Sequence, residues 1–346
     1  MELSAAFIGF GNVARSFAQM LNDNRKELEA RYDLRLRTKG IATASHGCII
    51  SPSTIDLIEA ANCVDAGGRL SDLRGSVAAS DPFDVISNCS TDVVFETTPL
   101  NPSNGEPATA HIRAALSKGS HVVTANKGPI AFAYSELKSL ADQNGLSLRF
   151  EGTVMDGAPV FNLIERCLPG VRVLSYAGVL NSTSNLILTR MEAGFEFDES
   201  LAEAKRRGIA EANSDYDIDG WDAAVKATVL ANVLFGTDLR PTVVDRQGIR
   251  GITLQAIEAA ARNSQALRLV ARGVKSDSGV SLKVGLETVA KESVLGSVSN
   301  TSNALLLETD LMGEIAIIES NPGVKQTAYA LLSDLIHIHQ SVKQRS

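Results

Sequence analysis

Short apolar runs alternate with amphipathic segments along the chain up to about residue 145. The apolar runs predict strands at residues 4–9, 33–44, 91–96 and 120–124. The amphipathic segments predict helices at residues 13–30, 55–63, 82–88, 107–118 and 130–143. Strands that alternate with helices are typical of a doubly wound α/β domain, in which helices cover a parallel sheet.

The pattern changes from about residue 150 onward. Strands are predicted at residues 171–180, as two antiparallel runs within 267–286, and at 304–307 and 314–318. Several helices lie between these strands in the chain, which indicates an α+β domain. We therefore expect a first domain at residues 1–149, an α+β domain at 150–323, and an amphipathic C-terminal helix at 324–346 that returns to the first domain.

Composition and charge narrow the range of partners. Of the 346 residues, 44% are hydrophobic and 21% are charged, and the formal net charge is −7. These are the proportions of an ordinary globular protein. An acidic chain without a basic block is a poor candidate for binding nucleic acid or an anionic membrane. We expect a small-molecule substrate, no nucleic acid and no membrane.

Cysteine spacing and the N-terminus indicate the compartment. The cysteines form no Cys-x-x-Cys pair and stand at Cys48, Cys63, Cys89 and Cys167. This spacing argues against a zinc site or a disulfide framework and favours free thiols in a reducing cytosol. The N-terminus lacks the basic start of a secretory signal, and no apolar run reaches the ~18 residues that span a bilayer. We expect a cytoplasmic protein.

A Gly-x-Gly-x-x-Ala motif, Gly9 to Ala14, follows the first predicted strand and opens the first predicted helix. Gly9 permits a tight turn, and Gly11 lets the backbone approach a pyrophosphate. Ala14 allows close packing of helix on strand, with the helix N-terminus facing the anion. The motif predicts a Rossmann-type dinucleotide site. The alternative is a strand-to-helix turn that binds no ligand.

The end of the second strand bears on the choice of dinucleotide. A site specific for NAD usually has an acid there, which accepts a hydrogen bond from the ribose 2′-hydroxyl. Residues 41–47 contain no acid, and the next carboxylate is Asp56. This favours NADP. NAD stays open, because no single arginine stands where the 2′-phosphate would obviously lie.

Two segments follow strands at the sheet edge where α/β proteins bind ligands, at residues 97–99 and 124–127. Lys127 is either a catalytic or substrate-binding ammonium, or a surface lysine at a helix start. A cation is poorly placed at a helix N-terminus, which favours the functional role.

A second set of charges lies on an apolar helix. Lys226 is the only charged residue within 223–236, and such a helix is buried. A buried ammonium is costly unless it is paired, and Asp222 lies one turn earlier on the same face. The pair is either a proton-transfer site or a structural ion pair.

Other carboxylates suggest binding roles. Glu211 and Asp217 are suited to a substrate ammonium, although Glu211 is also explained as a solvated helix-end charge. In the turn at 151–159, Glu151 and backbone carbonyls could coordinate a hard cation, and a plain loop explains the turn equally well.

These motifs occur in an order that resembles the homoserine dehydrogenase family, at residues 9–13, 124–129, 151–159, 180–185, 208–211 and 217–226. The resemblance runs from residue 5 to about 335, and the last motif is the most specific. It implies a homodimer in which NADPH or NADH reduces aspartate 4-semialdehyde to homoserine, a step of amino-acid biosynthesis.

The resemblance also implies roles for single residues. Lys226 and Lys127 would handle the proton and polarise the aldehyde, and the substrate would be held by Glu211, Asp222 and Asp217. The dinucleotide would be lined by Gly9, Phe10, Gly11, Asn12, Val13, Thr98, Lys127, Gly208 and Gly323. A monovalent cation, sodium or potassium, would be held by Glu151 and by the carbonyls of Val154, Asp156 and Ala158.

Some positions depart from the family pattern. Met155 and Asp156 replace the usual small residues, and Gly323 stands alone where a Gly-x-Gly cluster is common. Residues 97–102 resemble a short subgroup that lacks the C-terminal regulatory domain. The alternatives are a related NAD(P)-dependent dehydrogenase for another amino-acid-like aldehyde or hydroxy compound, and a dinucleotide sensor without catalysis. Two costly lysines argue against the sensor.

Overall fold

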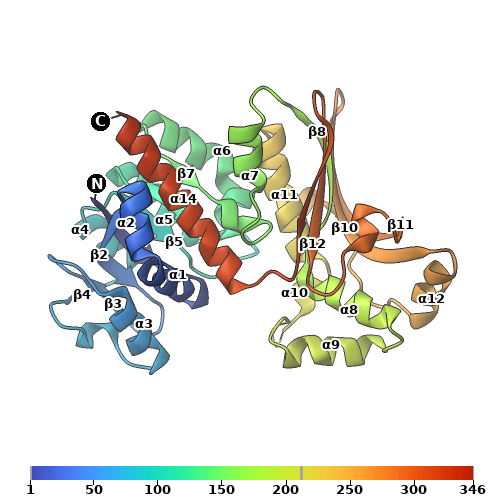
Figure 1. Ribbon diagram of the computed structural model, residues 1–346, viewed down its shortest axis with the longest axis horizontal. Coiled ribbons are helices and arrows are strands. Elements are labelled where there is room, and N and C mark those ends of the chain that lie inside the picture. Colours follow the sequence, from blue (N-terminus) through green and yellow to red (C-terminus); the bar gives the residue numbers. More distant parts are fainter. Residues whose placement is uncertain (1, 211–212, 346) are drawn as a thin grey trace. The chain divides into compact units, whose positions relative to one another are not determined.

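The computed structural model describes residues 2–210 and 213–345, and the chain forms two compact units (Figure 1). The first unit contains Met1–Pro159 and Gly323–Ser346, and the second contains Val160–Pro322. The predicted division after residue 149 differs from this one, because residues 150–159 pack with the C-terminal helix. The backbone N–H of Glu151 donates to the Asp334 carboxylate in that helix at 3.0 Å.

The first unit is built on a seven-stranded sheet in the order β4-β3-β2-β1-β5-β6-β7. The strands are β1 (Glu2–Ile8), β2 (Arg35–Ala42), β3 (Cys48–Ile50), β4 (Val77–Ala79), β5 (Val93–Glu96), β6 (His121–Thr124) and β7 (Leu148–Arg149). From β2 to β7 the neighbours pair in parallel, as the sequence predicts. At one side the sheet continues with two strands that the sequence did not predict, since β3 pairs antiparallel with β2 and β4 antiparallel with β3.

Seven helices are described in the first unit. They are α1 (Asn12–Asp23), α2 (Arg25–Tyr32), α3 (Leu57–Asp65), α4 (Pro82–Asn88), α5 (Ala108–Lys118), α6 (Lys127–Gln143) and α14 (Val324–Arg345). The single helix predicted at 13–30 is two helices that meet at Asn24. The Asn24 side-chain amide and its backbone N–H both donate to the Met20 carbonyl, at 2.8 Å and 3.1 Å. Asn24 itself has non-helical dihedrals, φ −103° and ψ 8°, which end α1.

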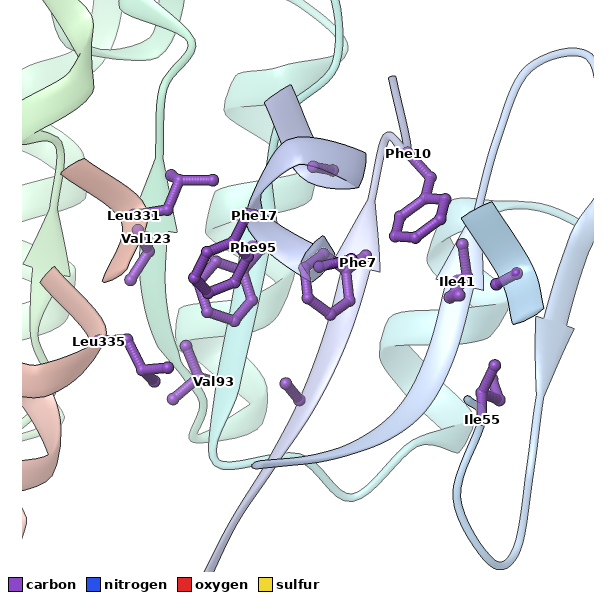
Figure 2. Close-up of a cluster of buried hydrophobic side chains, with 14 of the residues drawn as sticks. Phe7, Phe10, Phe17, Ile41, Ile55, Val93, Phe95, Val123, Leu331 and Leu335 are labelled. Atoms are coloured by element: carbon purple, nitrogen blue, oxygen red, sulfur yellow. The ribbon is translucent and has the colours of Figure 1, made fainter. Parts of the chain in front are cut away.

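An aromatic cluster forms the core of the first unit (Figure 2). The rings of Phe7 and Phe95, on neighbouring strands, stack at 4.8 Å, and Phe17 of α1 packs on Phe95 at 5.0 Å. Leu331 and Leu335 of α14 belong to the same cluster. Burying each such side chain stabilises the fold by roughly 1.5–3 kcal/mol, so the C-terminal helix completes this core.

The second unit contains a six-stranded sheet in the order β13-β12-β8-β10-β11-β9. Its strands are β8 (Val173–Val179), β9 (Asp245–Arg246), β10 (Gln265–Ser276), β11 (Gly279–Ala290), β12 (Asn303–Thr309) and β13 (Gly313–Glu319). Its helices are α7 (Val160–Asn162), α8 (Ser182–Glu192), α9 (Phe197–Arg206), α10 (Asp215–Ile218), α11 (Trp221–Phe235), α12 (Leu254–Arg262) and α13 (Val294–Ser297).

Helix α11 packs on this sheet through Tyr176. The Tyr176 hydroxyl of β8 donates to the Ala227 carbonyl of α11 at 2.6 Å. The ring of Tyr176 stacks on Phe235 at 5.6 Å. The predicted hairpin is confirmed, since β10 and β11 pair antiparallel along their whole length. Among the described helices, none is long and apolar enough to cross a membrane.

Candidate active site

The glycine turn after β1 has the geometry that a pyrophosphate needs. Gly9 has a φ of +89°, and a Cβ there would come within 2.6 Å of the Thr97 carbonyl carbon, so only glycine fits. Gly11 is the N-cap of α1, and a Cβ at Gly11 would meet nothing within 4 Å. The backbone is therefore open to an anion at the N-terminus of α1. The residues fit a dinucleotide.

The loop after β5 is tied to the glycine turn. The Thr97 hydroxyl donates to the Gly9 carbonyl at 2.8 Å. The next residue, Thr98, donates its hydroxyl to the buried carboxylate of Glu96. The Asn126 side chain, after β6, donates to the Thr98 carbonyl at 3.0 Å. The ends of β1, β5 and β6 are thus joined at one sheet edge.

Lys127 is the first residue of α6, next to the cap Asn126. The Asn126 side chain accepts a hydrogen bond from Gly128 N at 2.9 Å, and Asn126 N donates to the Thr124 hydroxyl at 3.0 Å. These two bonds fix the backbone on both sides of Lys127. Its half-buried side chain therefore starts from the same sheet edge as the glycine turn.

The turn at 151–159 is held by α14. Glu151 is buried, as are Val154 and Ala158. Asp156 has a φ of +42°, and its carboxylate accepts a hydrogen bond from the Thr327 hydroxyl at 2.7 Å. Thr327 N in turn donates to the Gly323 carbonyl at 3.3 Å. Within the residues that the structure describes, no cluster of His, Cys, Asp or Glu side chains could hold a metal ion. A cation at this turn would therefore depend mainly on backbone carbonyls.

The second unit brings a lysine and two carboxylates together. The Lys226 ammonium lies 3.3 Å from the Asp222 carboxylate, and their side chains are 13% and 7% exposed. The ammonium also donates to the Leu180 carbonyl, after β8, at 2.6 Å. The predicted pairing of these two residues is present in the structure, in a largely buried site.

Asn181 joins the acidic residues, and the sequence interpretation gave it no individual role. Its side-chain nitrogen donates to Asp217 at 2.7 Å and to Asp222 at 3.0 Å. Its side-chain oxygen accepts from Ser184 N at 2.8 Å and so caps α8. The capping position could have been found from the sequence, because asparagine is favoured there. The link to two distant carboxylates could not.

The negative charges of Asp217 and Asp222 act on a neighbouring tyrosine, Tyr216. Among the residues that the structure describes, none forms a hydrogen bond with the buried Tyr216 hydroxyl. Burial raises the pKa of Tyr216, and the charges of Asp222 and Asp217 raise it further. A site of this kind is suited to a cationic group such as a substrate ammonium.

Gly208 and Glu211 were also predicted to belong to the site. Gly208 lies two residues beyond α9, at a φ of +67° with nothing within 4 Å of a Cβ, so its backbone is open to a ligand. Glu211 lies outside the described residues.

A glycine turn open to a pyrophosphate and a buried lysine paired with aspartate define an NAD(P)-dependent dehydrogenase of the α/β class. A family model described as "Homoserine dehydrogenase, NAD binding domain" matches residues 9–151. The model described as "Homoserine dehydrogenase" matches residues 159–336. The chain belongs to the homoserine dehydrogenase family, oxidoreductases that act on CH–OH groups.

Relatives match over nearly the whole chain. The NAD(+)-dependent homoserine dehydrogenase of Pseudomonas canavaninivorans is 35% identical and covers 99% of this chain and 98% of its own. The homoserine dehydrogenase of Methanocaldococcus jannaschii is 36% identical, with coverage of 97% and 98%. A solved hyperthermophilic archaeal homoserine dehydrogenase in complex with NADPH is 28% identical, with a TM-score of 0.84 over 99% of this chain and 98% of that chain.

Proposed function

We propose that this protein interconverts L-homoserine and L-aspartate 4-semialdehyde with a nicotinamide dinucleotide, as a step of threonine, methionine and isoleucine biosynthesis. The observation that carries the proposal is the set formed by Lys226, Asp222, Asn181 and Asp217 in the second unit. Family membership supports the same reaction.

We assign proton transfer to Lys226. The Leu180 carbonyl and the Asp222 carboxylate hold its ammonium in one place. There it donates a proton to the aldehyde oxygen during reduction and takes it back during oxidation. The Lys127 ammonium is assigned to polarise the aldehyde. The bound dinucleotide supplies or accepts the hydride.

Asp217 and Asp222 are assigned to the substrate ammonium, together with Glu211. Asn181 supports this assignment because its side-chain nitrogen donates to both carboxylates and so holds them side by side. A related dehydrogenase for another amino-acid-like aldehyde or hydroxy compound is the alternative, because Asp156 adds a carboxylate to the turn at 151–159. That carboxylate accepts a hydrogen bond from Thr327, in the same unit.

NADP is proposed as the preferred dinucleotide. The loop between β2 and β3, residues 43–47, has no carboxylate. One relative is named as NAD(+)-dependent and another was solved with NADPH, so NAD is retained as a second cofactor. The dinucleotide is assigned to Gly9, Phe10, Gly11, Asn12, Val13, Thr98, Lys127, Gly208 and Gly323.

Three further assignments belong to the proposal. A sodium or potassium ion is assigned to Glu151 and the carbonyls of Val154, Asp156 and Ala158, since oxygen donors suit such cations. A homodimer is proposed, supported by the exposed apolar side chains of Leu311, Met312 and Ile318 around β13. The location is proposed to be the cytoplasm.

A substrate series tests the reaction. The purified protein is given homoserine, its analogue without the amino group and a homologue with a longer side chain, each with NADP and with NAD. Nicotinamide absorbance reports turnover. The proposal expects kcat/KM for homoserine to exceed that for the deaminated analogue at least tenfold, because the carboxylates would lose their charged partner. Equal values would overturn the assignment of Asp217 and Asp222.

A further inference from the structure

An arginine, Arg15, contacts the glycine turn, although the sequence did not single it out as a ligand of the 2′-phosphate. Arg15, in the first turns of α1, donates from Nη1 to the Phe10 carbonyl at 3.1 Å. Its Nη2 donates to the Asn12 side chain at 2.8 Å. A guanidinium has five N–H donors, so these two bonds hold the group at the turn and leave donors for an anion.

A carboxylate from a distant part of the chain meets this arginine. Asp65, the last residue of α3, lies 3.0 Å from Arg15 Nε. Residues 41–47 contain no acid, and the next carboxylate in the sequence is Asp56. The structure supplies an acid from the end of the following helix.

The segment after Asp65 is hydrogen-bonded to the loop that follows β2. The His46 ring nitrogen Nδ1 and the Gly68 carbonyl are 2.7 Å apart. Leu70 N donates to the His46 carbonyl at 2.9 Å. The Arg15–Asp65 pair therefore lies at the glycine turn and beside the loop after the second strand. In doubly wound domains this is the place of the adenosine ribose.

Arg15 and Asp65 are exposed enough for each to bind a ligand group in place of the other. The Arg15 side chain is 22% exposed and that of Asp65 is 61% exposed. An ion pair this exposed contributes little to stability. A phosphate can replace the carboxylate at Arg15, because guanidinium binds phosphate strongly with two parallel hydrogen bonds.

We propose that Arg15 and Asp65 set the preference between NADP and NAD, an inference that rests on the dinucleotide part of the proposed function. Arg15 binds the ribose 2′-phosphate of NADP after Asp65 turns away. Asp65 accepts a hydrogen bond from the ribose 2′-hydroxyl of NAD and repels the 2′-phosphate. Each residue thus favours one dinucleotide.

Binding titrations test this without catalysis. Dissociation constants for NADPH and NADH are measured by nicotinamide fluorescence with the wild type, Asp65→Asn and Arg15→Gln. Asp65→Asn is expected to lower the ratio of the NADPH to the NADH constant about tenfold, and Arg15→Gln to raise it about tenfold, as for one charge-assisted hydrogen bond. The matched control is Arg25→Gln, which removes an exposed arginine paired with Glu29 in α2. It should leave the ratio unchanged.

The ratio separates specificity from general damage. If both constants change by the same factor, or neither changes, Arg15 and Asp65 do not discriminate and the inference fails. The inference also fails if neither nucleotide binds. If the ratio shifts as expected but homoserine is not oxidised, the inference stands and the assigned substrate is wrong. If homoserine is oxidised and the ratio stays fixed, only the inference fails.

Discussion

The Lys226 ammonium lies 3.3 Å from the Asp222 carboxylate, one helical turn away on α11. Buried ion pairs add little stability over apolar residues of the same size, so a fold gains little from placing one in an apolar helix. The same pair provides a fixed proton donor and acceptor at a defined point. This contrast favours a chemical role for Lys226 over a structural one.

Replacement of Asn181 should weaken substrate binding more than turnover. Asn181→Ala removes the donor shared by Asp217 and Asp222, and KM for homoserine should rise about tenfold as the two carboxylates repel. Loss of the α8 cap should also lower the free energy of unfolding by about 1 kcal/mol. Steady-state kinetics and urea unfolding measure the two effects.

Two further variants separate the cap from the charge. Asn181→Asp keeps a capping oxygen but adds a third negative charge, so it should stay folded and still raise KM. Thr253→Ala removes the cap of α12, which accepts from Ala256 N, and should lower stability without changing KM. A normal KM in Asn181→Asp would remove Asn181 from the binding site.

Glu96 should act as a positioning residue for the loop after β5. Its carboxylate is fully buried, accepts from the Thr98 hydroxyl and lies 3.5 Å from His111 Nδ1. Glu96→Ala leaves these groups unpaired, which costs roughly 1–3 kcal/mol. The melting temperature should fall, and the Kd for NADPH should rise.

The conservative variant provides the control for Glu96. Glu96→Gln keeps an acceptor for Thr98 and should restore most of the NADPH affinity. If both variants bind NADPH as the wild type does, Glu96 supports only the fold.

Stability should fall as the pH drops below about 6.5 because of His339 in α14. Burial lowers the pKa of His339 from its ordinary value of 6.5, and within the described part of the chain the buried His339 Nδ1 has no hydrogen-bond partner. Below pH 6.5 the unfolded chain takes up a proton that the folded chain does not, so the unfolded state is favoured. Above that pH the imidazole is neutral in both states and has no such effect.

Urea unfolding at pH 7.5 and 5.5 checks this sign. The loss of stability between the two values should be smaller in His339→Gln than in the wild type. An equal pH effect in His339→Gln and the wild type would show that another group titrates.

Local patterns account for the parts that the sequence predicted. The Gly9 turn and the apolar helix around Lys226 have signals within a few residues, and both are present in the structure. The last two strands at one side of the sheet, β3 and the edge strand β4, have three residues each, too few for a pattern of alternation. Their antiparallel pairing therefore could not be predicted.

The contacts of Asn181 and Asp65 depend on tertiary packing, which is why the sequence did not reveal them. Asn181 reaches Asp217 across 36 positions of sequence. Asp65 meets Arg15 only because α3 packs beside α1. No spacing rule connects residues so far apart, although each residue type suits its role. The sequence thus suggested residue types for the site, and these supporting contacts could be found only in the folded chain.

The most direct test compares the wild type with Lys226→Ala. The absorbance of reduced nicotinamide is followed with homoserine and NADP, then NAD, in sodium and potassium buffers, and NADPH binding is titrated separately. The account predicts homoserine-dependent reduction by the wild type. In the variant it predicts a loss of kcat of about 10²–10⁴-fold with unchanged NADPH binding, and a lower melting temperature because the buried Asp222 carboxylate loses its charged partner. Turnover near the wild-type rate in Lys226→Ala would contradict the assigned mechanism.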